Sequence, residues 1–122
     1  MNEWSAAAEI LDRARDLIEE HGWQQGATDA VQSHCLATAL EASLRHTGHS
    51  MVDFNYAREA LSQRLGIARN PSDGPQGGSE VPYWGGPLME WNDTPGRSKR
   101  EVVKELQAAA ELARRLSLGR AS

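Results

Sequence analysis

Apolar residues recur at intervals of three and four positions in four stretches of the chain, and this period is that of an amphipathic helix. The first stretch predicts a helix over residues 3–21, with charged residues on the opposite side. Its apolar side comprises Trp4, Ala7, Leu11, Ala14 and Ile18. Gly22 follows as a stop signal, because glycine readily adopts the conformations that end helices.

A second helix is expected to begin at Asp29, where Gln32 provides capping-box spacing, or at Ser33. It ends at Gly48, after His46 and Thr47. The apolar seam of this helix comprises Val31, Cys35, Leu36, Ala39, Leu40, Ser43 and Leu44.

The third helix is predicted from Ser50, with Asp53 at the third helical position, to Leu65, and Gly66 ends it. Met51 is expected to pack near its start. Its predicted buried face comprises Phe54, Ala57, Leu61 and Leu65.

The last helix has the clearest start, because Ser98 and Glu101 form a capping box. A competing start places Thr94 at the N-cap and Pro95 at the first helical position. Gly119 is expected to end the helix. Its apolar stripe comprises Val102, Leu106, Ala109, Ala113 and Leu116.

Between the third and the last helix, residues 71–96 hold all five prolines, six of the 11 glycines and two of the four tryptophans. Loops longer than about 12–15 residues are usually functional or disordered, and aromatic residues argue against plain disorder. We therefore predict an all-α fold, a single-domain four-helix bundle over residues 1–118. A long Gly/Pro/Trp-rich loop (67–97) precedes the last helix, and residues 119–122 form a frayed tail.

Composition indicates a soluble cytoplasmic protein, and the absence of known metal and nucleotide motifs predicts no cofactor. A chain of 122 residues suits one domain, and its hydrophobic content of 39% predicts a thin core with close helix contacts. The single cysteine cannot form an internal disulfide, which suits a reducing compartment. The N-terminus lacks the features of a signal peptide, and no apolar run reaches the length of about 18 residues that a membrane span needs.

The net charge of −4 is unevenly distributed. Residues from Arg97 onward carry +4, and residues 1–96 carry −8. The acidic body disfavours nucleic acid as a partner. The basic last helix either attracts an anionic partner or lies against the acidic body of its own chain.

Cys35 is the first candidate for chemistry, because the N-terminus of a helix stabilises the reactive thiolate form of a nearby cysteine. A histidine such as His21, His34 or His49 and the carboxylate of Asp93 would complete a set of nucleophile, base and orienting residue. The alternative is a core cysteine, since free cysteine is among the most buried residue types.

Metal and nucleotide sites are not predicted. His46 and His49, with His34 and Cys35, offer ligands, but their spacing matches no standard zinc pattern. The glycines near Trp23 are not followed by the Lys-Ser/Thr of a phosphate-binding loop.

Two tryptophan-containing segments form the candidate binding region: the HGW turn (residues 21–26) and the WND segment (residues 91–93). We expect them to meet, because each carries a tryptophan with no long apolar run of its own to bury it. Trp23 and Gln25 would then line a pocket, and Trp91, Asn92 and Arg97 would form a recognition surface. The structural alternative is that both tryptophans anchor turns to the core.

Arg97, Lys99 and Arg100 crowd the start of the last helix, where positive charge opposes the helix dipole. Such a cluster would suit a phosphate or carboxylate ligand. Pairing of Arg97 with Asp93 or Glu90 is the alternative.

The sequences of the HGW turn, of residues 35–40 (Cys-Leu-Ala-Thr-Ala-Leu) and of residues 91–98, followed by Glu101-Val102, resemble a family of uncharacterised small proteins. These proteins, classified by a domain of unknown function, come from high-GC Gram-positive bacteria and their phages. The resemblance covers residues 7–113. Thr38 departs from the pattern, since family members often have glycine there. The resemblance implies an accessory or phage-related role.

We therefore expect a non-enzymatic protein-interaction module that acts through residues 71–97 and the last helix. Tyr83, Trp84, Trp91 and Arg97 are of the types enriched at binding hot spots, and Asn92 and Asp93 lie among them. The alternative is a small-ligand protein or enzyme with a pocket between the HGW turn, Cys35 and the WND segment.

Overall fold

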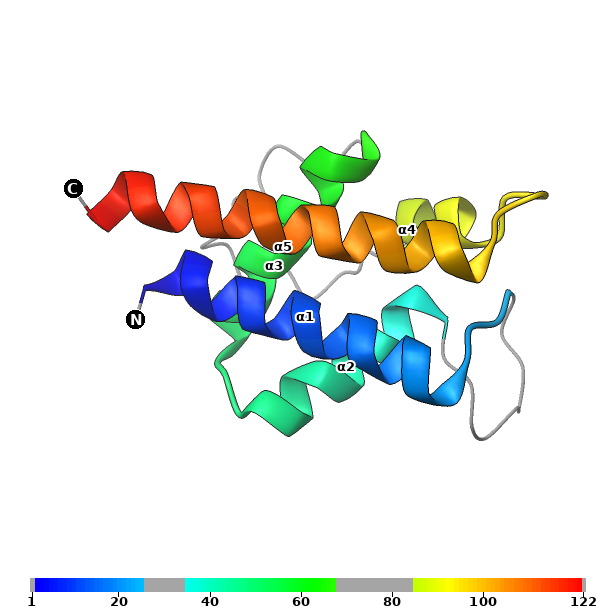
Figure 1. Ribbon diagram of the computed structural model, residues 1–122, viewed down its shortest axis with the longest axis horizontal. Helices are drawn as coiled ribbons and strands as arrows, with labels where there is room; N and C mark the ends of the chain where they lie inside the picture. The colour runs from blue at the N-terminus through cyan, green and yellow to red at the C-terminus, as the bar shows by residue number, and fades with distance from the viewer. Residues whose placement is uncertain (1, 26–34, 68–84, 122) are drawn as a thin grey trace.

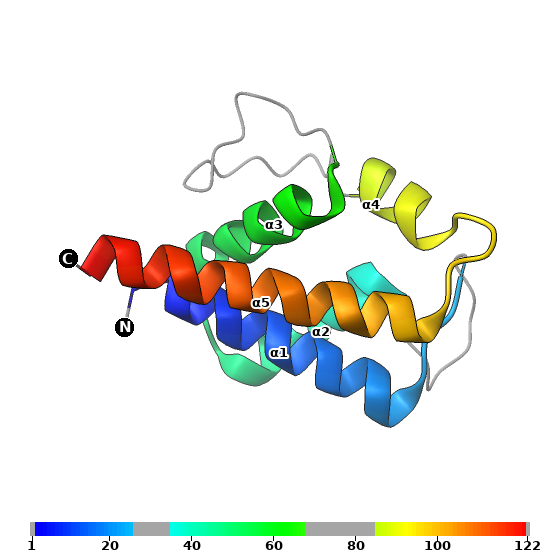
Figure 2. The same cartoon turned by 45° about the horizontal axis from the view of Figure 1, so that its top comes forward.

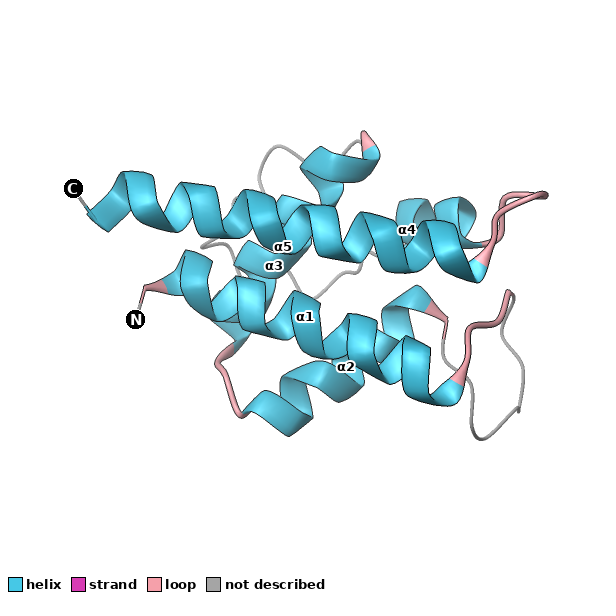
Figure 3. Ribbon diagram, viewed as in Figure 1, coloured by secondary structure: helices cyan, strands magenta, loops and turns pink. Residues whose placement is uncertain are grey.

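The computed structural model describes residues 2–25, 35–67 and 85–121, which form five helices and no strand (Figures 1 and 3). The helices are α1 (Glu3–His21), α2 (Leu36–Thr47), α3 (Met51–Leu65), α4 (Gly85–Asn92) and α5 (Lys99–Ala121). The predicted all-α class is confirmed. The four predicted helices correspond to α1, α2, α3 and α5, and α4 is an additional helix within the segment predicted to be a loop.

The two longest helices, α1 and α5, lie side by side and antiparallel, so that both chain ends are at the same end of the molecule (Figures 1 and 2). Helix α1 also contacts α2 and α3, and α3 contacts α5. Small residues let these helices approach closely: Ala7 and Ala14 of α1 and Ala109 and Ala113 of α5 are completely buried. This agrees with the thin, alanine-rich core expected from the composition.

Larger side chains fill the space between α1, α2 and α3. The Trp4 and Tyr56 rings meet edge to face, with centroids 4.8 Å apart, and Phe54 is buried nearby in the same core. A buried hydrogen bond joins α2 to α1, since Ser43 Oγ donates to the carbonyl of Ile10. The core therefore combines one aromatic cluster with small-residue helix contacts.

The predicted limits of α3 are confirmed. Ser50 accepts a hydrogen bond from the N–H of Asp53, whose carboxylate accepts one from the N–H of Ser50. Gly66 has φ +69°, the left-handed conformation expected at this helix end. Met51 was expected to pack near the start of α3, but it is 59% exposed.

Helix α5 starts as the capping box predicts, since Ser98 Oγ accepts from the N–H of Glu101 at 3.2 Å. The competing start at Thr94 is wrong, because residues 94–98 form turns in which Gly96 has φ +85°. The expected stop at Gly119 is also wrong, since the helix continues to Ala121. A lone glycine weakens a helix by about 1 kcal/mol and so need not end it.

Helix α2 begins later than expected. Asp29 and Ser33, the two predicted starts, lie outside the described residues, but Cys35 has extended backbone angles and is the N-cap of a helix that begins at Leu36. A helix running continuously from either predicted start is therefore wrong. The end at Gly48, with φ +71°, is confirmed.

Helix α4 was not predicted because its sequence, which opens Gly-Gly-Pro, has little intrinsic helix preference. Proline is nevertheless tolerated in a first helical turn, where backbone N–H groups have no partner within the helix. Packing supplies the rest: Leu88 and Asn92 are buried, and the helix contacts α2.

None of the described helices combines the length and apolar composition needed to cross a membrane.

Candidate functional site

Asn92, the last residue of α4, joins three distant parts of the chain. Its Oδ1 accepts a hydrogen bond from Trp23 Nε1 at 2.7 Å and another from the N–H of Leu36 at 3.1 Å. Its Nδ2 donates to the carbonyl of Gln24 and to Asp93 Oδ1. The side chain is completely buried, and its two donors and two acceptor positions are all used.

Gln25 adds a second connection between the same segments. Its Nε2 donates to the carbonyl oxygens of Asn92 and Thr94 at 3.1 and 2.9 Å. The HGW turn and the WND segment are therefore in contact, as expected. Trp23 Nε1, Gln25 Nε2 and the side-chain amide of Asn92, which a pocket between the segments would offer to a ligand, are bonded within the protein.

Trp91 and Arg97 form a compact unit at the corner between α4 and α5. The guanidinium carbon of Arg97 lies 3.8 Å from the centroid of a Trp91 ring, and Arg97 Nε donates to the Trp91 carbonyl at 3.0 Å. Arg97 also pairs with Glu101, one turn into α5. Glu101 was not among the expected partners, Asp93 and Glu90, although the spacing of four residues is the usual one for helical ion pairs.

The three basic residues at the start of α5 do not converge on one point. Arg97 faces Trp91 and Glu101, whereas Lys99 Nζ reaches the carbonyl of Glu19 at 3.5 Å. Arg100 is exposed on another side of the helix. A single anion held by all three is therefore not preformed.

The described contacts of Cys35 and His49 are with residues outside the predicted set of nucleophile, base and orienting residue. Cys35 is buried, with its sulfur 3.5 Å from Thr38 Oγ1. His49 Nε2 lies 2.9 Å from Glu9, and His21 is exposed at the end of α1, while His34 lies outside the described residues. The described geometry favours the interpretation of Cys35 as a core residue.

The described residues contain no group of three or more histidine, cysteine, aspartate or glutamate side chains that could hold a metal ion. Tyr83 and Trp84, two of the predicted binding residues, lie outside the described part of the chain.

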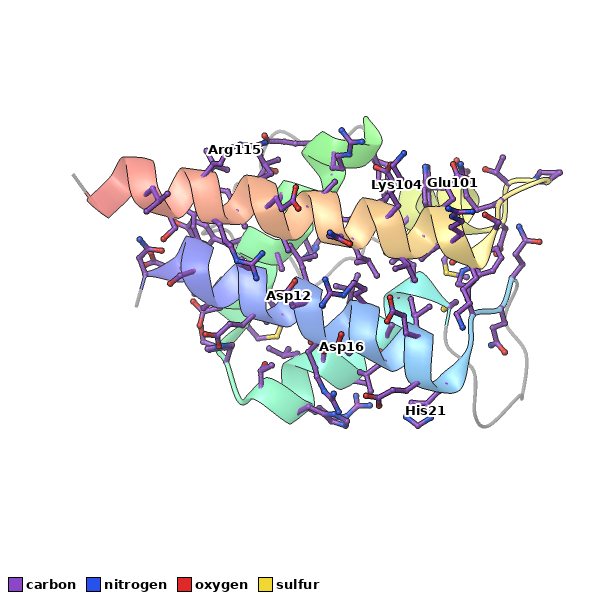
Figure 4. All side chains as sticks on the ribbon, in the orientation of Figure 1. Asp12, Asp16, His21, Glu101, Lys104 and Arg115 are labelled. Carbon is purple, nitrogen blue, oxygen red and sulfur yellow. The ribbon has the colours of Figure 1, made fainter. Side chains whose placement is uncertain are left out.

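A further surface lies on α5, the last helix, which the sequence interpretation expected to take part in binding without naming the side of the helix. Residues at helical spacing line the side opposite its buried stripe, and we call this the α5 outer face: Arg100, Lys104, Gln107, Glu111 and Arg115. All five are exposed. Figure 4 shows Lys104 and Arg115 projecting on the side of α5 away from α1.

Three adjoining hollows follow this face. One of about 630 Å³ is lined by Ser98, Arg100, Glu101, Lys104 and Glu105. The next, of about 400 Å³, shares Arg100 and Lys104 and extends to Ala108 and Glu111. The third, of about 420 Å³, shares Ala108 and Glu111 and reaches Arg115 and the end of α3.

Some charged residues of α5 form ion pairs with other helices, and others do not. Arg114 pairs with Asp12 of α1, and Glu105 pairs with Arg64 of α3. Arg100, Lys104 and Arg115 form no ion pair with any described residue. Pairing with the acidic body of the same chain therefore accounts for Arg114 but not for Arg100, Lys104 and Arg115. The helical spacing of these three residues was the sequence signal that could have identified the face.

A family model described as "Family of unknown function (DUF6197)" matches residues 3–112. The chain therefore belongs to this family. No curated protein and no solved structure shows significant similarity to it. Family membership agrees with the uncharacterised family expected from the motifs and leaves the activity open.

Proposed function

We propose that this protein is an interaction module that binds a protein partner through the outer face of α5 and the corner of residues 93–98. The observation that carries the proposal is the continuous run of hollows from Ser98 to Arg115. They lie on a helix whose opposite side is held in the core by Val102, Leu106 and Ala109. A rigid helix with one buried and one hollowed face presents its side chains to a partner without needing to reorganise.

The proposal extends the role expected of residues 71–97. Asp93 and Thr94 are exposed beside the start of α5, and the Trp91–Arg97 unit fixes this corner. The anion expected near Arg97, Lys99 and Arg100 becomes, in this proposal, a carboxylate of the partner that reaches Arg100. An accessory, phage-related role in the cytoplasm, as the resemblance suggests, is part of the same proposal.

Site-specific photo-crosslinking in the native host tests the proposal. A photoreactive amino acid at Gln107, on the α5 outer face, is expected to give a discrete protein adduct. The same residue at Glu41, which is exposed on α2, serves as the matched control. The adduct at Gln107 should disappear when Arg100 and Lys104 are both replaced by glutamate. Equal labelling from the two positions, or an adduct that survives the double replacement, would contradict the proposal.

A further inference from the structure

The α5 outer face has the properties of a groove for a single amphipathic helix. Helix-in-groove recognition combines an apolar strip with polar groups at helical intervals. Ala108, which is small, and Leu112, which is half-buried, lie one helical turn apart on the same side of α5 and line the hollow of about 420 Å³ together. A small residue at this central position lets the backbone of a second helix approach.

The charges of this face indicate which charge its occupant should carry. Arg100, Lys104 and Arg115 point outward without described ion-pair partners, whereas Glu101 and Glu105 are neutralised by Arg97 and Arg64. Glu111 is the one acidic residue of the α5 outer face. The uncompensated charge of the face is therefore positive, although the whole chain carries −4.

The mixture of charges also separates a peptide from a nucleic acid. Glu111, which forms no described ion pair, lines two of the three hollows, so a uniform row of phosphates would meet its carboxylate in both. An acidic helix can place its apolar or neutral side chains there and its carboxylates beside the three basic residues. Complementary charges of this kind determine which partner binds and in which register.

We propose that the occupant of this groove is an acidic amphipathic helix of a partner protein, lying along α5 from Arg100 to Arg115. This inference rests on the proposed function and specifies the chemistry of the partner. With a rise of about 1.5 Å per residue, the distance along α5 corresponds to about 22 Å, so an occupant of about 15–18 residues covers it. Its apolar residues contact Ala108 and Leu112.

The probe is a synthetic helical peptide of about 18 residues, with leucine every third or fourth position on one side and glutamate on the other. Binding to the full chain is measured by fluorescence anisotropy of the labelled peptide. We expect a Kd in the range of about 10–100 μM, since one helix in an open groove buries a small interface. The affinity should fall about tenfold or more between about 50 mM and 500 mM NaCl, because exposed charges are screened.

Matched variants assign the binding to the face. Lys104→Glu combined with Arg115→Glu should weaken binding about tenfold or more, whereas Arg45→Glu, an exposed change on α2, should leave it unchanged. A peptide with glutamine in place of glutamate should bind at least about tenfold more weakly. Amide chemical shifts that change along residues 100–115 provide a readout that needs no substitution.

Three results would overturn the inference. The first is no binding of the peptide at about 1 mM, which is well above the expected Kd. The others are equal binding by a single-stranded DNA oligomer and saturation of the face by a second copy of the chain. These failures differ from failure of the proposed function. A Gln107 adduct whose crosslinked segment is neutral or basic would preserve the interaction module and refute the acidic helix.

Discussion

Asn92 caps the N-terminus of α2 by accepting a hydrogen bond from the N–H of Leu36, 56 residues earlier in the chain. The first N–H groups of any helix lack partners within the helix and are commonly satisfied by the side chain of the N-cap residue. Here the N-cap is Cys35, whose side chain makes no such bond. The end of α4 therefore supplies the cap that the local sequence of α2 lacks.

Replacement of Asn92 by alanine should destabilise the protein by about 2–4 kcal/mol, because Trp23 Nε1, the Leu36 N–H and the Gln24 carbonyl would all lose a partner. The free energy of unfolding from urea denaturation measures this. Gln107→Ala, at an exposed position, is the control and should change stability by less than about 0.5 kcal/mol. A loss at Asn92 no larger than that of the control would show that the network contributes little.

Arg97→Met should destabilise the protein by about 1–2 kcal/mol. The change keeps most of the side-chain length but removes the charge above Trp91 and the donors to the Trp91 carbonyl and Glu101. The side chain is 15% exposed, so its bonds are only partly screened by solvent. Arg100→Met, one turn away on the exposed side, is the matched control.

Tryptophan fluorescence gives a second readout for the same pair of variants. Loss of the Arg97 guanidinium should shift the emission of the native protein, because Trp91 loses its covering group, whereas Arg100→Met should leave the spectrum unchanged. Identical spectra and equal stability for the two variants would refute the assigned role of Arg97.

The thiol of Cys35 should react with a thiol reagent only when the protein opens. The residue is 5% exposed, and reagents attack the accessible thiolate. Only molecules that are open at a given moment react, so labelling in native buffer should be slower than in denaturant. For a local opening that costs more than about 4 kcal/mol, the labelling rate should fall roughly a thousandfold or more. Rapid labelling of the folded protein near neutral pH would restore the nucleophile hypothesis.

The sequence was sufficient for those parts of the fold whose signals are local. Ser50, Ser98 and Gly66 marked helix ends correctly, since a cap needs only residues three or four positions away. Helix α4 was missed because its Gly-Gly-Pro opening has little helix preference, and the start of α2 was missed because its cap is supplied by Asn92, which is distant in the chain. A hydrogen bond between residues 92 and 36 leaves no periodic trace in a single sequence.

The candidate site shows the same division. The HGW turn and the WND segment were expected to meet, because two tryptophans without apolar runs needed burial. Their polar residues were expected to serve a ligand, and instead they bond to one another. The α5 outer face could be predicted from residue spacing alone, but which basic residues of α5 pair with α1 depends on the antiparallel packing of α1 and α5.

The same substitution at two glycines should have opposite effects on stability. Gly96 has φ +85°, a conformation that costs a residue with a Cβ about 1 kcal/mol, so Gly96→Ala should lower the free energy of unfolding by about that amount. Gly119 lies within α5, and a Cβ built there has no atom within 4 Å. Gly119→Ala should therefore raise stability by a few tenths of a kcal/mol, about half of the usual gain, because helix ends fray. Thermal and urea denaturation of both variants give the two signs directly. A stabilising Gly96→Ala would contradict the left-handed turn before α5, and a destabilising Gly119→Ala would contradict the continuation of α5 to Ala121.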